Sequence, residues 1–467
     1  MPADPDAPEP PDQHPCPDGR HGTDGPRGPY GPRDGAPVLD ERRRAVLAWR
    51  GLALGVLGQT TATVVIAGPA FLIPFLRSAY GFSLTLSGTA AAATSVGMVL
   101  TLVAWGALAD RLGERLVIAA GLLGAALATG LGLLLALDGR LAEPLPLFCV
   151  LALAGAAGAS VNSATGRVVA GWFPRERRGL AMGIRQMSQP LGTGIAALLV
   201  PAAAARWDLP GFFALATVLA AVSGIACWLG VVDPPRPART ELPAAASAAG
   251  PASAADPAQA ADAAPAADTA SAGASSNPYR GSSFLHRIHL VSALLVIPQF
   301  TFVTYGLVWL IDVQQMEAHT AGLVVGAAQL VGAGGRIAMG GLSDLAPSRM
   351  FVLRLVALAA AVLTGAVAAA SLGVWPVLGA VLLVLASTAS VADNGLAFTS
   401  IAEAAGHRWS GKALGIQNTG QHIVSSGVGP LVGALITGLG YPAALACVAA
   451  VPVVASLLVP RHDVERP

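Results

Sequence analysis

The sequence predicts an all-α polytopic membrane protein with twelve transmembrane helices in two pseudo-symmetric six-helix bundles. Of its 467 residues, 54% are hydrophobic and only 12% are charged, which is too little charge to solvate the surface of a soluble domain of this length. The mean hydropathy is +0.62. The apolar residues fall in runs of about 20 or more, the length that an α-helix needs to cross a bilayer.

These apolar runs form two groups of six, separated by a central segment rich in Pro, Ala and Ser. The first group is expected at 49–76, 86–109, 116–137, 145–173, 180–204 and 210–232. The second group is expected at 288–311, 320–343, 351–372, 375–402, 411–439 and 441–460.

The remaining segments have no hydrophobic pattern and cannot bury enough surface to fold. Residues 1–45 are predicted to be a disordered N-terminal tail, 233–285 a flexible linker and 461–467 a C-terminal tail. The first bundle then occupies 46–232 and the second 286–460.

Arginines outside the apolar runs gather on one side of the predicted membrane. The other side holds Arg77, Arg140 and Arg206. Because cytoplasmic segments carry the excess of positive charge, we expect both termini and the linker in the cytoplasm. The protein is therefore predicted to be a multi-pass protein of the cell membrane, with the lipid bilayer as its surroundings.

A short charged turn links the second and third apolar runs. It carries Gly106, Asp110, Arg111, Gly113 and Arg115 in the order Gly-x-x-x-Asp-Arg-x-Gly-x-Arg. The glycine permits close helix approach, and the aspartate can accept hydrogen bonds from the first amides of the next helix.

A degenerate copy of this turn, with Gly340 and Asp344, follows the eighth run. Residues 183–189 likewise resemble residues 415–421. Asn162 and Asn394 are separated by the same number of residues as these two segments. The turn resembles the signature loop between helices 2 and 3 of the major facilitator superfamily. This resemblance implies two related bundles around a central cavity, alternating access, and a gating role for both loops.

Arg336 is predicted to lie about two turns inside the eighth helix, where a charge is costly without a partner. The segment around it resembles helix 8 of monocarboxylate and oxalate/formate-type facilitators, which implies that Arg336 binds a substrate carboxylate. A guanidinium suits this role because its planar fork pairs with both oxygens. The alternative is a structural pairing with Asp344 or Asp393.

Other polar residues in the apolar runs are candidates for substrate contact. Arg185 and Gln189 lie in a segment that resembles helix 5 of cyanate- and nitrate-type anion facilitators, whereas Arg185 and Arg167 could equally be structural. The other candidates are Gln59, Asn162, Asn394 and Gln421. Asp393 and His422 are candidates for proton coupling, since both can titrate near neutrality in such surroundings.

The sequence therefore predicts a secondary active transporter of a small solute, an organic anion such as a carboxylate, with proton coupling as an open question. One alternative is a proton-coupled multidrug or metabolite efflux antiporter, and another is a transporter-like solute sensor. No nucleotide-binding loop, metal cluster or nucleophile arrangement is present, so we expect no enzyme activity, cofactor, metal or nucleic-acid partner. We expect a monomer.

Overall fold

The computed structural model describes residues 41–173, 175–234, 278–281, 283–346 and 348–463. Almost all of these residues lie in helices, and no strand occurs among them. The predicted N-terminal tail up to residue 40, the linker at 235–277 and residues 464–467 lie outside the described chain. The all-helical class predicted from the apolar runs is confirmed.

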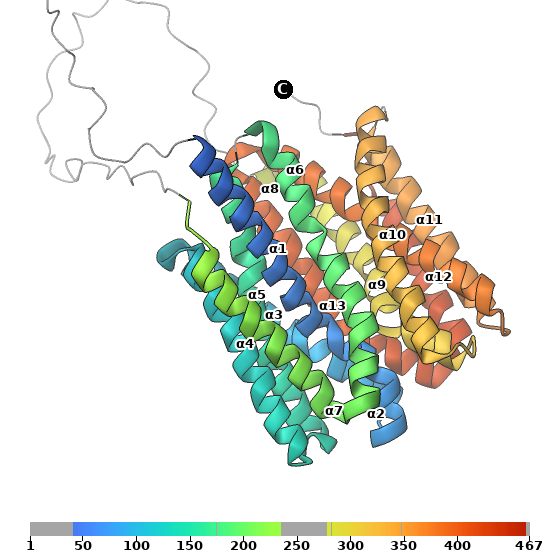
Figure 1. Cartoon of the computed structure of the whole chain (residues 1–467). Helices are drawn as coiled ribbons and strands as arrows, with labels where there is room; N and C mark the ends of the chain where they lie inside the picture. Colours follow the sequence, from blue (N-terminus) through green and yellow to red (C-terminus); the bar gives the residue numbers. More distant parts are fainter. Residues whose placement is uncertain (1–40, 174, 235–277, 282, 347, 464–467) are drawn as a thin grey trace, which may run out of the picture.

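Among the described residues, the first half of the chain contains seven α-helices of very different lengths and one short 3-10 helix, Arg140–Ala142; their arrangement is drawn in Figure 1. The α-helices are α1 (Glu41–Phe71), α2 (Ile73–Tyr80), α3 (Leu84–Leu112), α4 (Glu114–Leu137), α5 (Pro144–Trp172), α6 (Arg175–Gln186) and α7 (Ser188–Gly230). We call these helices the N-half.

The second half begins with one helical turn and ends with a very long helical stretch. Its helices are α8 (Pro278–Gly281), α9 (Phe284–Asp312), α10 (Ala318–Leu345), α11 (Arg349–Ala370), α12 (Pro376–Val391) and α13 (Asp393–Leu458). We call these helices the C-half. Figure 1 shows α2 at one end of the bundle and α6 and α8 at the other, and we name the two ends after α2 and α8.

Nine helical stretches within the described residues are long and apolar enough to cross a membrane. Two of them, 183–230 and 412–458, have 48 and 47 residues, about twice the length needed for one crossing. Each contains a break: Asp208 in α7 has φ 59° and ψ −158°, and Gly440 in α13 has φ 78°. The count of twelve crossings stays a prediction.

Several helix boundaries differ from the predicted ones. α1 begins at Glu41, so residues 41–45 are helical and not part of a tail, and α9 begins inside the predicted linker, at Phe284. α3 continues to Leu112, which leaves Gly113 alone between α3 and α4. Gly113 has φ 99°, a conformation open to glycine that lets α4 start at once.

The N-half and the C-half each pack mainly on their own helices, and they meet along α3 with α13 and α7 with α10. These contacts involve very small residues at the α2 end. Gly194 of α7 faces Gly326 of α10, and a β-carbon on Gly194 would lie 3.5 Å from the Gly326 carbonyl oxygen. A hydrogen bond of 3.3 Å joins Thr85 of α3 to Thr437 of α13. The halves are therefore in contact at the α2 end.

Candidate functional site

A narrow cavity, partly open to solvent, lies between the halves, against α9, α10 and α12 of the C-half and the start of α7 in the N-half. One charged residue, Arg336, lines it. The polar and apolar lining residues are Pro190, Gln299, Phe302, Val303, Ala328, Gln329, Gly332, Ala333, Ser387, Ser390 and Val391. The cavity thus combines one cation, two amides and two hydroxyls with an apolar wall, as ligand sites commonly do.

Arg336 is half-buried in the wall of this cavity. Its Nε is shielded from solvent and has no hydrogen-bond partner, and within the described residues the guanidinium makes no hydrogen bond or ion pair. Gly332 and Gly335, in the preceding turn, lie against Val391 and Thr388 of α12. These glycines let α10 and α12 approach closely beside the arginine.

Asp393 is the acidic residue whose charge acts on that of Arg336. It is 2% exposed and lies in the first turn of α13, directly after the break at Ala392. The two charged groups interact electrostatically, yet in the described chain no ion pair joins them. One carboxylate oxygen of Asp393, Oδ2, is buried without a hydrogen-bond partner. Both charged groups therefore keep unused hydrogen-bonding capacity.

A chain of amides leads from the cavity into the C-half. Asn394 donates from Nδ2 to Oε1 of Gln299, over 3.2 Å, and accepts at Oδ1 from Nε2 of Gln421, over 3.0 Å. Gln421 also donates to the Ser292 hydroxyl, over 2.8 Å. The structure thus brings two of the candidate residues, Asn394 and Gln421, into contact with a cavity-lining glutamine.

In the N-half, Arg185 and Asn162 also lie together. Arg185 donates from Nε to the Thr165 hydroxyl, over 2.8 Å, and from Nη2 to the backbone oxygen of Asn162, over 3.2 Å. No carboxylate pairs with Arg185 among the described residues. Its hydrogen bonds go to neutral oxygens of its own half, and it does not line the cavity.

The remaining candidates are not gathered at the cavity. Gln59 of α1 is 5% exposed, with its Oε1 buried and unbonded. Gln189 precedes the cavity-lining Pro190, and its backbone oxygen accepts from Thr193. His422 follows Gln421 but is absent from the cavity wall, and its Nδ1 is buried without a partner. The side chain of Arg167 lies outside what the structure describes.

The charged turn predicted after the second apolar run lies partly within α3, and the predicted contact of Asp110 with the next helix stays a prediction. Asp110 and Arg111 belong to the last turn of α3, and the side chain of Asp110 lies outside what the structure describes. The backbone amide of Arg115, in the first turn of α4, donates to Oδ1 of Asp233, over 2.7 Å. An acid just after α7 therefore helps to cap α4.

The second copy of the turn repeats this arrangement. The amides of Arg349 and Met350, at the start of α11, donate to Asp463, over 3.2 and 3.0 Å. Asp463 follows the last helix of the C-half just as Asp233 follows that of the N-half. The side chain of Asp344 and the surroundings of Gly340 lie outside the described part of the chain. Sequence reasoning missed both capping acids, although each lies within three residues of the end of the last apolar run of its half.

Comparison with known proteins places the chain in a family. The family model of the Major Facilitator Superfamily matches residues 55–430. An uncharacterized MFS-type transporter of Mycobacterium tuberculosis, Rv2994, is 42% identical over 407 residues, which cover 86% of this chain and 83% of the relative.

Two solved structures share the fold at low sequence identity. A bacterial homolog of the human lysosomal transporter Spinster, in an inward-facing and unoccupied conformation, has a TM-score of 0.66 at 14% identity, covering 90% of this chain and 97% of that chain. The nucleoside transporter NupG has a TM-score of 0.64 at 12% identity, covering 87% and 98%. By its family match, its relative and its fold, this chain is a member of the Major Facilitator Superfamily of membrane transporters.

Proposed function

We propose that the protein is a secondary transporter of a small organic anion, a carboxylate bound at Arg336, and that it works by alternating access. The observation that carries this proposal is the guanidinium of Arg336, which lines the cavity between the halves and uses none of its hydrogen bonds on the described residues. A carboxylate supplies what this group lacks, because its two oxygens match the guanidinium fork.

The neighbouring polar groups suit the same ligand. Gln299, Gln329, Ser387 and Ser390 line the cavity and can donate hydrogen bonds to a carboxylate or to a hydroxyl or keto group beside it. Asn394 fixes Gln299 through the amide chain. Phe302 and Val303 provide an apolar wall for the remainder of a small molecule.

Asp393 gives this binding site a means of proton coupling. The Asp393 carboxylate and a bound anion would compete for the charge of one guanidinium, since Asp393 already interacts with Arg336. A protonated Asp393 leaves the full charge of Arg336 to the anion. Anion and proton should therefore bind together, and the transported pair would carry no net charge.

The test is carboxylate binding by purified full-length protein, measured by calorimetry for the parent, Arg336→Lys, Arg336→Gln and Asp393→Asn. Arg336→Lys should bind weakly because an ammonium cannot form the two-point contact, and Arg336→Gln should not bind. Asp393→Asn should bind without taking up a proton. Arg206→Gln removes an exposed arginine at the α2 end and should behave as the parent.

The same variants separate binding from folding. If Arg336 and Asp393 form a structural pair, each neutral variant should be unstable and the double variant Arg336→Gln with Asp393→Asn should recover expression. Normal carboxylate binding by a stable Arg336→Gln protein would reject the anion site. Uptake into proteoliposomes, with and without a pH gradient, then distinguishes transport from solute sensing.

A further inference from the structure

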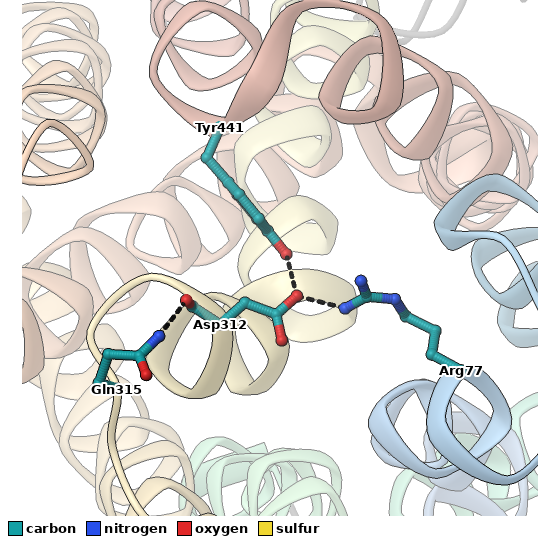
Figure 2. A network of polar contacts seen from close by, with 4 residues as sticks. All are labelled: Arg77, Asp312, Gln315 and Tyr441. Carbon is teal, nitrogen blue, oxygen red and sulfur yellow. Dashed lines mark hydrogen bonds and ion pairs between the residues drawn. The ribbon is translucent and has the colours of Figure 1, made fainter. Parts of the chain in front are cut away.

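An ion pair joins the two halves at the α2 end (Figure 2). Arg77, in the last turn of α2, pairs through Nη1 with Oδ2 of Asp312, the last residue of α9. The Tyr441 hydroxyl, at the second half of α13, donates to the same oxygen over 3.4 Å. The side chains of Arg77 and Asp312 are 36% and 30% exposed, so the pair is partly shielded from water.

Asp312 is held rigidly on the C-half. Gln315 donates from Nε2 to the backbone oxygen of Asp312, over 2.7 Å (Figure 2). Its neighbour Gln314 is fully buried and donates to the backbone oxygen of Ala370, over 3.0 Å, while accepting from the amide of Trp375, over 2.6 Å. The turn after α9 is therefore fixed to α11 and α12.

The helix that carries Arg77 is likewise fixed to the N-half, by a side-chain hydrogen bond. Tyr80, at the end of α2, donates to Oδ1 of Asp208, over 2.7 Å. Asp208 lies at the break in α7. Burial, this hydrogen bond and the Asp208 charge raise the pKa of the Tyr80 hydroxyl, so the hydroxyl keeps the proton that it donates. The short helix that carries Arg77 is thus tied to α7.

The hydrogen bonds that hold Asp312 and α2 in place each involve a residue with a backbone conformation that L-residues rarely adopt. Asp208 and Gln315, with φ 59° and φ 54°, are the non-glycine residues with positive φ among the described residues. Such conformations cost free energy and tend to persist where the surroundings impose them at functional positions. Here each one bonds to the helix that presents one member of the ion pair.

The ion pair joins the same two halves that meet along α3 and α13. Ala92 of α3 faces Gly429 of α13, and a β-carbon on Gly429 would lie 3.1 Å from that of Ala92. Ala92 is 8% exposed. Separating the halves at this end would expose Ala92, and such a separation must break the pair between Arg77 and Asp312.

We propose that Arg77, Asp312 and Tyr441 form a latch that holds the α2 end closed, and that the latch opens whenever the cavity becomes accessible from that end. The proposal rests on the alternating access proposed above, but not on the chemistry of the substrate. The latch fixes the position of one half relative to the other and does not contact the cavity. Substituting its residues should therefore change which end is accessible and leave the Arg336 cavity intact.

The test is the labelling rate of a reporter cysteine, Ala92→Cys, by a membrane-impermeant maleimide in vesicles. The reporter is placed in the full chain with Cys16, Cys149, Cys227 and Cys447 replaced by alanine. Asp312→Asn should label about two- to fivefold faster, the range expected for a partly exposed ion pair. The charge exchange Arg77→Asp with Asp312→Arg should return the rate toward that of the parent.

A matched control is available at the same end. Arg140 and Asp138 form an ion pair of 2.7 Å within the N-half, so Asp138→Asn removes a pair that does not join the halves and should leave labelling unchanged. Tyr441→Phe should give a smaller increase than Asp312→Asn. If Asp312→Asn fails to reach the membrane, Arg77→Gln removes the same pair from the other half and decides the test.

Parent-like labelling in Asp312→Asn or in Arg77→Gln would overturn the latch. So would an increase that the charge exchange does not reverse, or one that Asp138→Asn reproduces. The measurement needs no substrate, so a failed anion assignment at Arg336 would leave the latch result standing. Conversely, an inert latch would leave carboxylate binding by the parent unaffected.

Discussion

Gly88 of α3 lies against Gly429 of α13, where the halves meet. A β-carbon on Gly88 would lie 2.6 Å from the Gly429 carbonyl oxygen and would overlap the hydroxyl of Tyr305, which itself donates to that carbonyl. Only glycine leaves room for this approach of two backbones. Because this contact joins the two halves, we expect a substitution there to affect closure of the α2 end and not the folding of either half.

Gly88→Ala should therefore keep the α2 end from closing. We expect faster labelling of the Ala92→Cys reporter and loss of transport, with a thermal midpoint near that of the parent. Gly97→Ala is the contrasting variant, since its β-carbon would overlap Ala152 within the N-half; it should lower the thermal midpoint. Gly183→Ala, with open space around the added carbon, is the neutral control. Parent-like transport by Gly88→Ala would contradict the assignment.

Asn394→Ala should weaken both stability and substrate binding. It removes the hydrogen bonds that Asn394 makes with Gln299 and Gln421, and the loss of a buried partner costs about 1–3 kcal/mol. Gln299 then loses its fixed position in the cavity wall. Denaturation and binding measured together check this, with Asn418→Ala as the control on the same helix. Unchanged carboxylate affinity would show that the amide chain is structural only.

Asp110→Asn should lower the transport rate and leave substrate affinity nearly intact, because the charged turn is predicted to act in closure at the α8 end. Uptake kinetics and equilibrium binding are the two measurements needed. Asp138→Asn, an acid at the opposite end, is the control. A large loss of equilibrium binding in Asp110→Asn would argue against a gating role.

Deleting residues 244–275 should leave a folded, transport-competent protein, since this segment has no apolar face. Expression in the membrane, thermal midpoint and uptake would be compared with those of the full chain. A shorter deletion of 250–269 controls for the reach of the remaining linker. Failure of both deletions to insert would reveal structure that the composition does not predict.

The sequence predicted the helical architecture well because apolar length is a local property. It did not predict the wall of the cavity, since whether Gln329, Ser387 or Ser390 faces inward depends on the rotation of each helix against its neighbours. The latch could not be predicted from the sequence either, because Arg77 and Asp312 are 235 residues apart and meet only through the packing of the two halves. Asn394 and Gln421 were identified from the similarity between the two halves, and the structure places them in contact.

The depth of Arg336 has an electrical consequence. In α10 it lies about 27 Å from the start at Ala318 and about 14 Å from the end at Leu345, at about 1.5 Å per residue. An anion that reached Arg336 from the α2 end would have passed through roughly two-thirds of that helix. One elementary charge crossing the whole membrane exchanges about 2.3 kcal/mol per 100 mV. The membrane voltage would therefore do work on a bare anion, or oppose its movement. An anion accompanied by a proton on Asp393 would carry no net charge and would cross without electrical work.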